Sequence, residues 1–275
     1  GAKLSADRGP AEGYSPWKGG LMARFPDCDV IILCGGFGTR LQSVVSDRPK
    51  PMAEIHGRPF VSLLVEHFLR HGARRFIFST GHFGEMIEDW FLRHRGPYET
   101  VFVRDPVPLG TGGALAHAMP LVRSNPFLVL NGDSFCEIDP ERLLRFHTRK
   151  RAGATIAVTH DDTREDTGAV ALGEGDRLLS MVEKPRKRTS TYHNAGVYLF
   201  DRAVTTLFPD MPVWSLERDL LPRLATEQCY GFVTASPLHD IGTPERLAHF
   251  RDTWKDTSAY FPTSLLHQKQ GSMSR

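Results

Sequence analysis

The sequence has little of several features that mark specialised classes of protein. Its 275 residues include four cysteines, with no CxxC pair and no zinc-finger spacing, so neither a disulfide scaffold nor a zinc-binding domain is indicated. We expect four reduced, mostly buried thiols, as in a cytosolic enzyme. No apolar run approaches the roughly 18 residues that cross a bilayer, and the first residues lack the apolar stretch of a secretory signal. These absences predict a cytoplasmic protein without membrane contact.

The chain also lacks an excess of either charge. Its formal net charge is +2, so no overall basic field favours nucleic acid, and we expect no nucleic-acid partner. Any anionic ligand must therefore be held by a local arrangement of residues. Composition leaves open whether the chain forms a homo-oligomer.

Apolar and charged residues make up 40% and 24% of the chain, which is ordinary for a globular domain. Residues 1–28 are rich in Gly, Pro and Ser and predict a disordered extension or an expression remnant. We expect residues 256–275 to form a flexible tail. We expect residues 29–255 to form one domain.

Strand and helix patterns alternate in the first half of this domain. Residues 30–33 form a continuous apolar run that two glycines follow, which is typical of a buried strand. Further strands are predicted at 76–79, 100–103 and 127–130, with helices at 60–71, 83–93 and 112–122. This alternation predicts an α/β fold with a doubly wound, mostly parallel sheet.

Strands dominate the second half. After a helix at 140–151, strands are predicted at 154–159, 169–172, 178–182 and 195–200, and helices at 216–224 and 244–253. We interpret this half as a mixed β extension of the same sheet that carries a substrate site at its edge.

The stretch LCGGFGTRL at residues 33–41 is the most informative motif. Three glycines within four positions let the backbone approach a ligand closely, and successive N–H groups in such a loop can surround an anion. Arg40 adds a planar, permanent cation for phosphate oxygens. A P-loop would end in Gly-Lys-Ser/Thr, and a dinucleotide fingerprint would need glycine in place of Leu41, so both are excluded. A phosphate loop and a tight turn without ligand remain open from this motif alone.

A second motif, DRPKPM at residues 47–52, favours the phosphate loop. Lys50 stands between two prolines, which restrict the local backbone. A lysine held in this way can point at a phosphate group, whereas a lysine on a free loop would be solvated.

Together the two motifs resemble the signature of the sugar-1-phosphate nucleotidyltransferase family. The similarity continues in PLGTGG at 108–113, NGD at 131–133, EKP at 183–185, NAG at 194–196 and DIG at 240–242. It covers about residues 29–254. The resemblance implies a Rossmann-like nucleotidyltransferase fold, an Mg²⁺ cofactor, and transfer of a nucleoside monophosphate to a sugar 1-phosphate with release of pyrophosphate.

The resemblance also implies residue roles on the nucleotide side. The nucleotide would be held by the glycine loop, by the lysine between the prolines and by the start of PLGTGG, that is, by Leu33, Gly35, Gly36, Gly38, Thr39, Arg40, Lys50, Thr111 and Gly112. Asp133 follows a predicted central strand, where ligands of open α/β sheets bind, and a carboxylate beside a triphosphate suits Mg²⁺. The family resemblance makes Asp240 the second metal ligand.

On the sugar side, the resemblance implies that Lys184 binds the sugar phosphate and that Glu183 contacts sugar hydroxyls. Gly168 and Asn194 match positions that line the sugar pocket. Thr167 stands where many relatives have an aromatic residue, so it has no predicted role.

The expected reaction joins two anions. Like unit charges at 4 Å repel by about 4 kcal/mol at an effective dielectric of 20. Catalysis therefore needs compensating positive charge and positioning, which we assign to Mg²⁺, bound by Asp133, and to Arg40, Lys50 and Lys184. No general base is needed because the attacking phosphate is already ionised.

The strings ILCGGFGTRLQSVVSDRPKPMAEIHGRPF and NAGVYLF look most like D-glycero-α-D-manno-heptose 1-phosphate guanylyltransferases, so GTP and that heptose 1-phosphate are the predicted substrates and GDP-heptose the product. A mannose-1-phosphate guanylyltransferase and a UTP-dependent transferase are the alternatives within the family. A sugar-nucleotide sensor would not need the two metal ligands, and a nicotinamide-dependent dehydrogenase would need the missing third glycine.

Overall fold

A computed structural model describes residues 24–36, 46–160, 168–183, 192–225 and 228–255. The strands are β1 (Val30–Leu33), β2 (Glu54–Ile55), β3 (Arg58–Pro59), β4 (Arg75–Thr80), β5 (Glu99–Arg104), β6 (Phe127–Asn131), β7 (Ser134–Cys136), β8 (Ala154–His160), β9 (Ala169–Leu172), β10 (Leu178–Val182), β11 (Tyr192–Phe200), β12 (Cys229–Thr234) and β13 (Leu238–Asp240). The α-helices are α1 (Phe60–Arg70), α2 (Gly84–Arg93), α3 (Gly110–Ala118), α4 (Pro140–Lys150), α5 (Leu221–Leu224) and α6 (Pro244–Thr253). Short helical turns are η1 (Phe25–Asp27), η3 (Lys50–Met52), η4 (Met119–Leu121), η5 (Glu174–Asp176), η6 (Arg202–Leu207) and the π-helical turn η7 (Leu216–Leu220).

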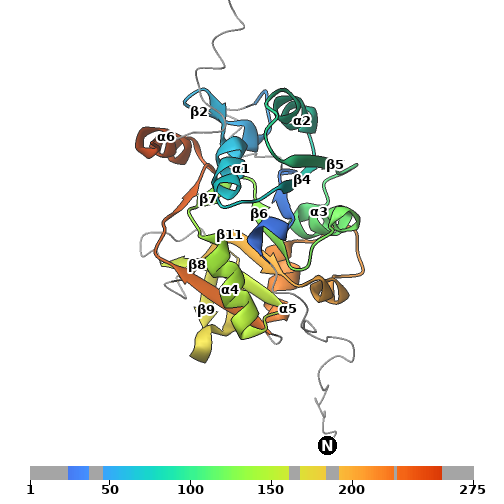
Figure 1. The fold of residues 1–275 in the computed structure, drawn as a ribbon, viewed down its shortest axis with the longest axis vertical. Coiled ribbons are helices and arrows are strands. Elements are labelled where there is room, and N and C mark those ends of the chain that lie inside the picture. The colour runs from blue at the N-terminus through green and yellow to red at the C-terminus, as the bar shows by residue number, and fades with distance from the viewer. Residues whose placement is uncertain (1–23, 37–45, 161–167, 184–191, 226–227, 256–275) are drawn as a thin grey trace, which may run out of the picture.

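A nine-stranded sheet runs through the molecule (Figure 1). Strands β5, β4, β1 and β6 are neighbours in that order and all run parallel. Strand β11 joins β6 antiparallel and begins the mixed half, in which it pairs with both β8 and β9. The predicted fold, a mostly parallel sheet with a mixed extension, is confirmed.

Alternating side chains of the strands build a core on each face of this sheet. On β1, Val30 and Ile32 pack with α1, α2, α4 and α6, whereas Ile31 and Leu33 pack with α3, α5 and η7. Successive strand residues point to opposite faces, so a strand that is apolar throughout must be covered on both sides.

The order of the parallel strands creates a topological switch point. The chain moves from β1 outward to β4 and β5 and then returns to the other side of β1 as β6. In open α/β sheets, ligands bind beyond the carboxyl ends of the strands at such a point. The ends of β1 and β6 therefore define where a site is expected.

Most predicted elements are present within a residue or two of their predicted limits. Strand β12 and the short ladders β2–β3 and β7–β13 were not predicted. The packed chain also starts earlier than residue 29, because Phe25 is 1% exposed and its ring lies 6.0 Å from that of Phe68. The remainder of the predicted extension and the tail at 256–275 lie outside the described residues.

The four cysteines are free and buried, as predicted. Burial raises the pKa of the Cys28 and Cys136 thiols to about 12, so neither is a thiolate at neutral pH. Among the described residues, no helix is long and apolar enough to span a membrane.

Candidate active site

The phosphate loop leaves the sheet at the switch point. Leu33 ends β1, and Gly35 and Gly36 follow it. Gly38, Thr39 and Arg40, and also Lys184 on the sugar side, lie outside the described residues, so their predicted roles remain predictions.

Lys50 and Asp133 meet at the end of β6. Lys50 opens η3 directly after Pro49, whose extended backbone precedes the turn. Its Nζ donates to Oδ2 of Asp133 at 2.6 Å. The lysine side chain is 11% exposed and the carboxylate 44%, so the cation is largely withdrawn from water while Asp133 still faces it. Two residues 83 positions apart that the sequence assigned to one site are therefore in direct contact.

Asp240 lies next to this pair. Strand β13 pairs with β7, which sets Asp240 opposite Ser134, and the backbone N–H of Ile241 donates to the carbonyl oxygen of Asp133 at 3.2 Å. A Cβ on Gly242 would stand 2.7 Å from Oδ1 of Asp240 and 3.6 Å from Nζ of Lys50. The two predicted metal ligands and Lys50 thus border one small space.

Further contacts hold Asp240 in place. Its Oδ1 accepts from the backbone N–H of Gly242 at 2.7 Å, and Arg246 approaches both carboxylate oxygens at 3.3 Å. The backbone N–H and the guanidinium together restrict the orientation of the carboxylate. Asp240 is therefore a fixed oxygen donor beside Asp133.

This donor set fits a hard divalent cation. Within the described part of the chain, no group of three or more His, Cys, Asp or Glu side chains is placed to hold a metal ion, so a cation here would have Asp133 and Asp240 as its protein ligands. Magnesium is commonly bound through one or two carboxylates, with phosphates and water completing the shell. The family that the sequence motifs resemble generally uses a divalent metal ion.

The described residues of the predicted sugar pocket converge on Gly168. The backbone N–H of Asn194 donates to the Gly168 carbonyl at 2.9 Å. A Cβ on Gly168 would stand 3.0 Å from Oε2 of Glu183 and 3.5 Å from Cβ of Asn194. A larger residue would therefore crowd these side chains, and the sugar pocket at this position stays a prediction.

Thr111 and Gly112 have partners inside the protein. The Thr111 hydroxyl donates to Glu217 at 2.6 Å and accepts from the N–H of Leu216 at 2.9 Å. The N–H of Gly112 donates to the carbonyl of Trp214 at 3.0 Å. These contacts anchor the start of α3 to η7, and the predicted contact of both residues with a base stays a prediction.

Gly112→Ala is expected to destabilise the protein by about 1–3 kcal/mol, the usual cost of overpacking a filled site. A Cβ there would stand 1.9 Å from Cε3 of Trp214, so the indole must move. In an exposed helix the same change stabilises by up to about 1 kcal/mol. The sign of the change in unfolding free energy therefore shows whether the site is filled. Urea unfolding of both proteins measures it, and a stabilised variant would contradict the packing described.

Asp105 is a candidate that the sequence analysis missed. It follows β5, where its N–H donates to the Thr80 carbonyl at 2.8 Å. Its carboxylate is 5% exposed and receives a 2.8 Å contact from His117, and its Oδ2 lies 3.3 Å from where a Cβ on Gly35 would stand. Burial raises the pKa of Asp105, and the contact with His117 opposes that rise. Its position after a parallel strand was the signal that could have identified it.

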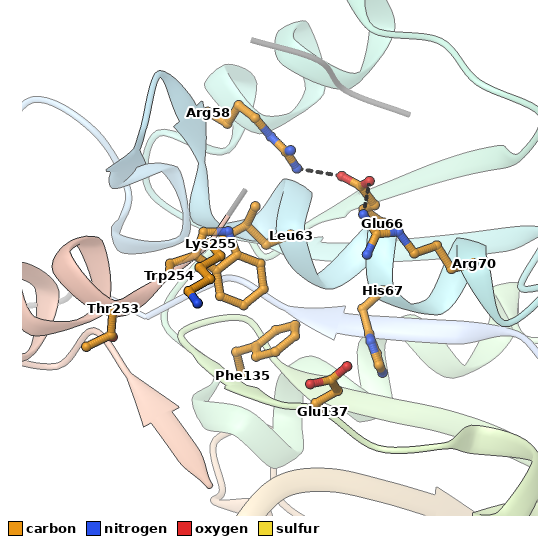
Figure 2. Close-up of a pocket in the computed structure, with 10 residues that line it drawn as sticks. All are labelled: Arg58, Leu63, Glu66, His67, Arg70, Phe135, Glu137, Thr253, Trp254 and Lys255. Atoms are coloured by element: carbon orange, nitrogen blue, oxygen red, sulfur yellow. Dashed lines mark hydrogen bonds and ion pairs between the residues drawn. The ribbon is translucent and has the colours of Figure 1, made fainter. Parts of the chain in front are cut away.

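A cavity of about 290 Å³ is bordered by residues of β3, α1, β7 and the end of α6 (Figure 2). Figure 2 shows Arg58 and Arg70 directed at Glu66, and Phe135 beside Trp254. Asp133 directly precedes β7, and Asp240 lies a short turn before α6. Both elements contribute residues to the lining of this cavity. It is lined by Arg58, Leu63, Glu66, His67, Arg70, Phe135, Glu137, Thr253, Trp254 and Lys255.

The chain is similar to proteins of known function. The mannose-1-phosphate guanylyltransferase of Mycobacterium tuberculosis is 33% identical over 221 residues, which cover 79% of this chain and 62% of that one. The D-glycero-α-D-manno-heptose 1-phosphate guanylyltransferase of Campylobacter jejuni is 30% identical over 220 residues, 80% of this chain and 97% of that one. The chain thus spans less than two thirds of the first relative and nearly all of the second.

A solved structure agrees with the fold. HddC from Yersinia pseudotuberculosis complexed with GMP-PN superposes with a TM-score of 0.72 at 32% identity, covering 83% of this chain and all of that one. A family model described as nucleotidyl transferase matches residues 29–255. The chain therefore belongs to the nucleotidyl transferase family.

Proposed function

We propose that the protein transfers GMP from GTP to D-glycero-α-D-manno-heptose 1-phosphate, giving GDP-heptose and pyrophosphate. The observation that carries the reaction class is the convergence of Lys50, Asp133 and Asp240 beyond the carboxyl ends of β1 and β6. Such a site supplies fixed charge for a step between two anions, which phosphoryl transfer chiefly requires. We propose the cytoplasm as its compartment, since nucleoside triphosphates are available there.

We propose Mg²⁺ as the metal ion, held by Asp133 and Asp240, where it would neutralise charge on the triphosphate. Lys50, together with Arg40, would hold the nucleotide phosphates, and Lys184 the sugar phosphate. The protein then serves mainly to place the attacking oxygen in line with the α-phosphate.

Similarity to the Campylobacter heptose enzyme over 97% of its length supports the heptose substrate. The 33% identity to the mycobacterial enzyme favours mannose 1-phosphate as the second candidate. Pyrophosphate release, measured for heptose and mannose 1-phosphates with GTP, ATP, CTP and UTP, separates these pairs through kcat/KM. A preference for mannose 1-phosphate or for UTP would overturn the substrate assignment, and no release with any pair would overturn the reaction class.

Asp105 supports guanine as the base. Guanine presents two adjacent donors, N1–H and the N2 amino group, and one carboxylate can accept both. The Asp105 carboxylate borders Gly35, at the start of the phosphate loop, because a glycine there leaves it room. We therefore propose that Asp105 reads the guanine edge.

Asp105→Asn should reduce the preference for GTP over ATP by about 10- to 100-fold, the range for losing a bidentate contact worth about 1–3 kcal/mol. The amide has one acceptor oxygen and cannot receive both guanine donors. Ratios of kcat/KM for GTP and ATP measure the effect. Glu85→Gln is the matched control. Glu85 also loses a negative charge in this change, and it forms an exposed ion pair with Arg104, the last residue of β5 and the neighbour of Asp105 in the sequence. An unchanged ratio in Asp105→Asn would assign base recognition to other residues.

A further inference from the structure

A buried polar network links the nucleotide side of the site to the sugar side. At its centre is Glu217 of η7, which is 8% exposed. Its Oε2 accepts from the hydroxyls of Thr111 at 2.6 Å and Ser215 at 3.0 Å. Its Oε1 receives a longer contact, 3.5 Å, from the hydroxyl of Tyr198. A buried carboxylate with this many donors is held firmly in one orientation.

The network continues to a residue of the predicted sugar pocket. Nδ2 of Asn194 donates to the Tyr198 hydroxyl at 2.7 Å, and Oδ1 of Asn194 accepts from the N–H of Gly196 at 3.0 Å. Both amide atoms are therefore oriented from within the protein. The amide carries a second N–H, and Asn194 stands beside Gly168 and Glu183.

An irregularity in β11 makes this contact possible. Residues four apart on a regular strand are about 13 Å apart, too far for these side chains to meet. Between Asn194 and Tyr198, β11 advances four residues while β8 advances two, from Val158 to Ile156. Gly196 lies in this segment with a φ of +70°, and bulges of this kind redirect side chains. The distortion therefore brings Asn194 within reach of Tyr198.

We propose that Glu217 is a positioning residue for both substrates, a role that rests on the proposed function. Through Thr111 it fixes the start of α3 for the nucleotide, and through Tyr198 it fixes the Asn194 amide for the sugar 1-phosphate. Hydroxyl donors on both of its oxygens require an acceptor at each position. Glutamine would present an amino group at one of these positions and would remove the negative charge that strengthens the hydrogen bonds at the other, so binding of both substrates would be affected.

The test separates the path from Glu217 to Thr111 from the path through Tyr198 to Asn194. In Tyr198→Phe, the Kd for D-glycero-α-D-manno-heptose 1-phosphate should rise about 10-fold, the upper range for one hydrogen bond, with the Kd for a non-hydrolysable GTP analogue unchanged. In Glu217→Gln, both Kd values should rise. Calorimetry of each ligand, with the other present, measures them independently of turnover. Tyr98→Phe is the control, because the hydroxyl of this tyrosine donates to the carbonyl of His94 at 2.8 Å and the residue directly precedes β5, in the parallel half of the fold.

A double-mutant cycle tests the 3.5 Å link itself. If Glu217 acts on the sugar side through Tyr198, then Tyr198→Phe added to Glu217→Gln should raise the sugar-phosphate Kd no further. Independent, multiplying effects would overturn the coupling, as would equal losses of both ligands in Tyr198→Phe. If the wild-type enzyme is active and either of these two results is found, the positioning role is contradicted and the proposed function is not. A wild-type chain that binds neither ligand contradicts the proposed function and this role with it.

Discussion

Asp133→Asn is expected to lose at least about 10²–10³-fold in turnover, the usual effect of removing a preorganised charge from a transition state. The amide lacks the negative charge that a divalent cation requires. It also removes the carboxylate that contacts Lys50 at 2.6 Å. Lys50→Ala should produce a loss of similar size, because its cation would face the phosphates. Steady-state pyrophosphate release over a range of magnesium concentrations measures both variants.

The chain offers a matched control for this pair. Lys150 and Asp176 form the same type of ion pair at 3.1 Å, away from the switch point, with side chains 28% and 46% exposed. Lys150→Ala and Asp176→Asn should retain wild-type turnover, since exposed pairs contribute about 0–1 kcal/mol. Thermal unfolding establishes that all four variants remain folded. Wild-type turnover in Asp133→Asn would remove this residue from the site.

The parallel half of the sheet was predictable because its central strands, β1 and β6, are apolar on both faces. Val30–Leu33 has no polar residue, and all four of its residues are buried. Strand β12 was missed because its sequence, CYGFVT, contains a glycine and has no continuous aliphatic run. Strands β7 and β13 have three residues each, too few for any periodicity to be visible.

The site was predictable where a residue lies in a recognisable local motif and less so where no motif marks it. Proline restriction and strand position indicated Lys50 and Asp133 separately, and their side chains are in contact. No local pattern links Thr111 with Glu217, 106 residues later. Such a contact depends on how α3 and η7 pack, so spacing in the sequence carries no signal of it.

Removing a single charged side chain should reduce the stability of the protein strongly in the interior beside the cavity. Arg58 and Glu66 pair at 2.7 Å with side chains 2% and 4% exposed, and Arg70 reaches the other carboxylate oxygen from the surface at 2.7 Å. Removing two charges from water is costly, and the contacts between the charged groups offset that cost. Removing one partner therefore affects stability far more than removing both.

Glu66→Gln is expected to destabilise the protein by about 3–5 kcal/mol, because it removes the anion that the buried Arg58 cation contacts at 2.7 Å. That is a large share of the roughly 5–15 kcal/mol that holds a domain folded. The double variant Arg58→Met/Glu66→Leu should recover most of the loss, since an apolar pair fills similar volume without a desolvated charge. Arg70→Gln is the control, because its side chain is 40% exposed and should cost less than about 1 kcal/mol. Urea unfolding gives all four free energies, and a double variant no more stable than Glu66→Gln would show that side-chain packing, rather than the unpaired charge, causes the loss.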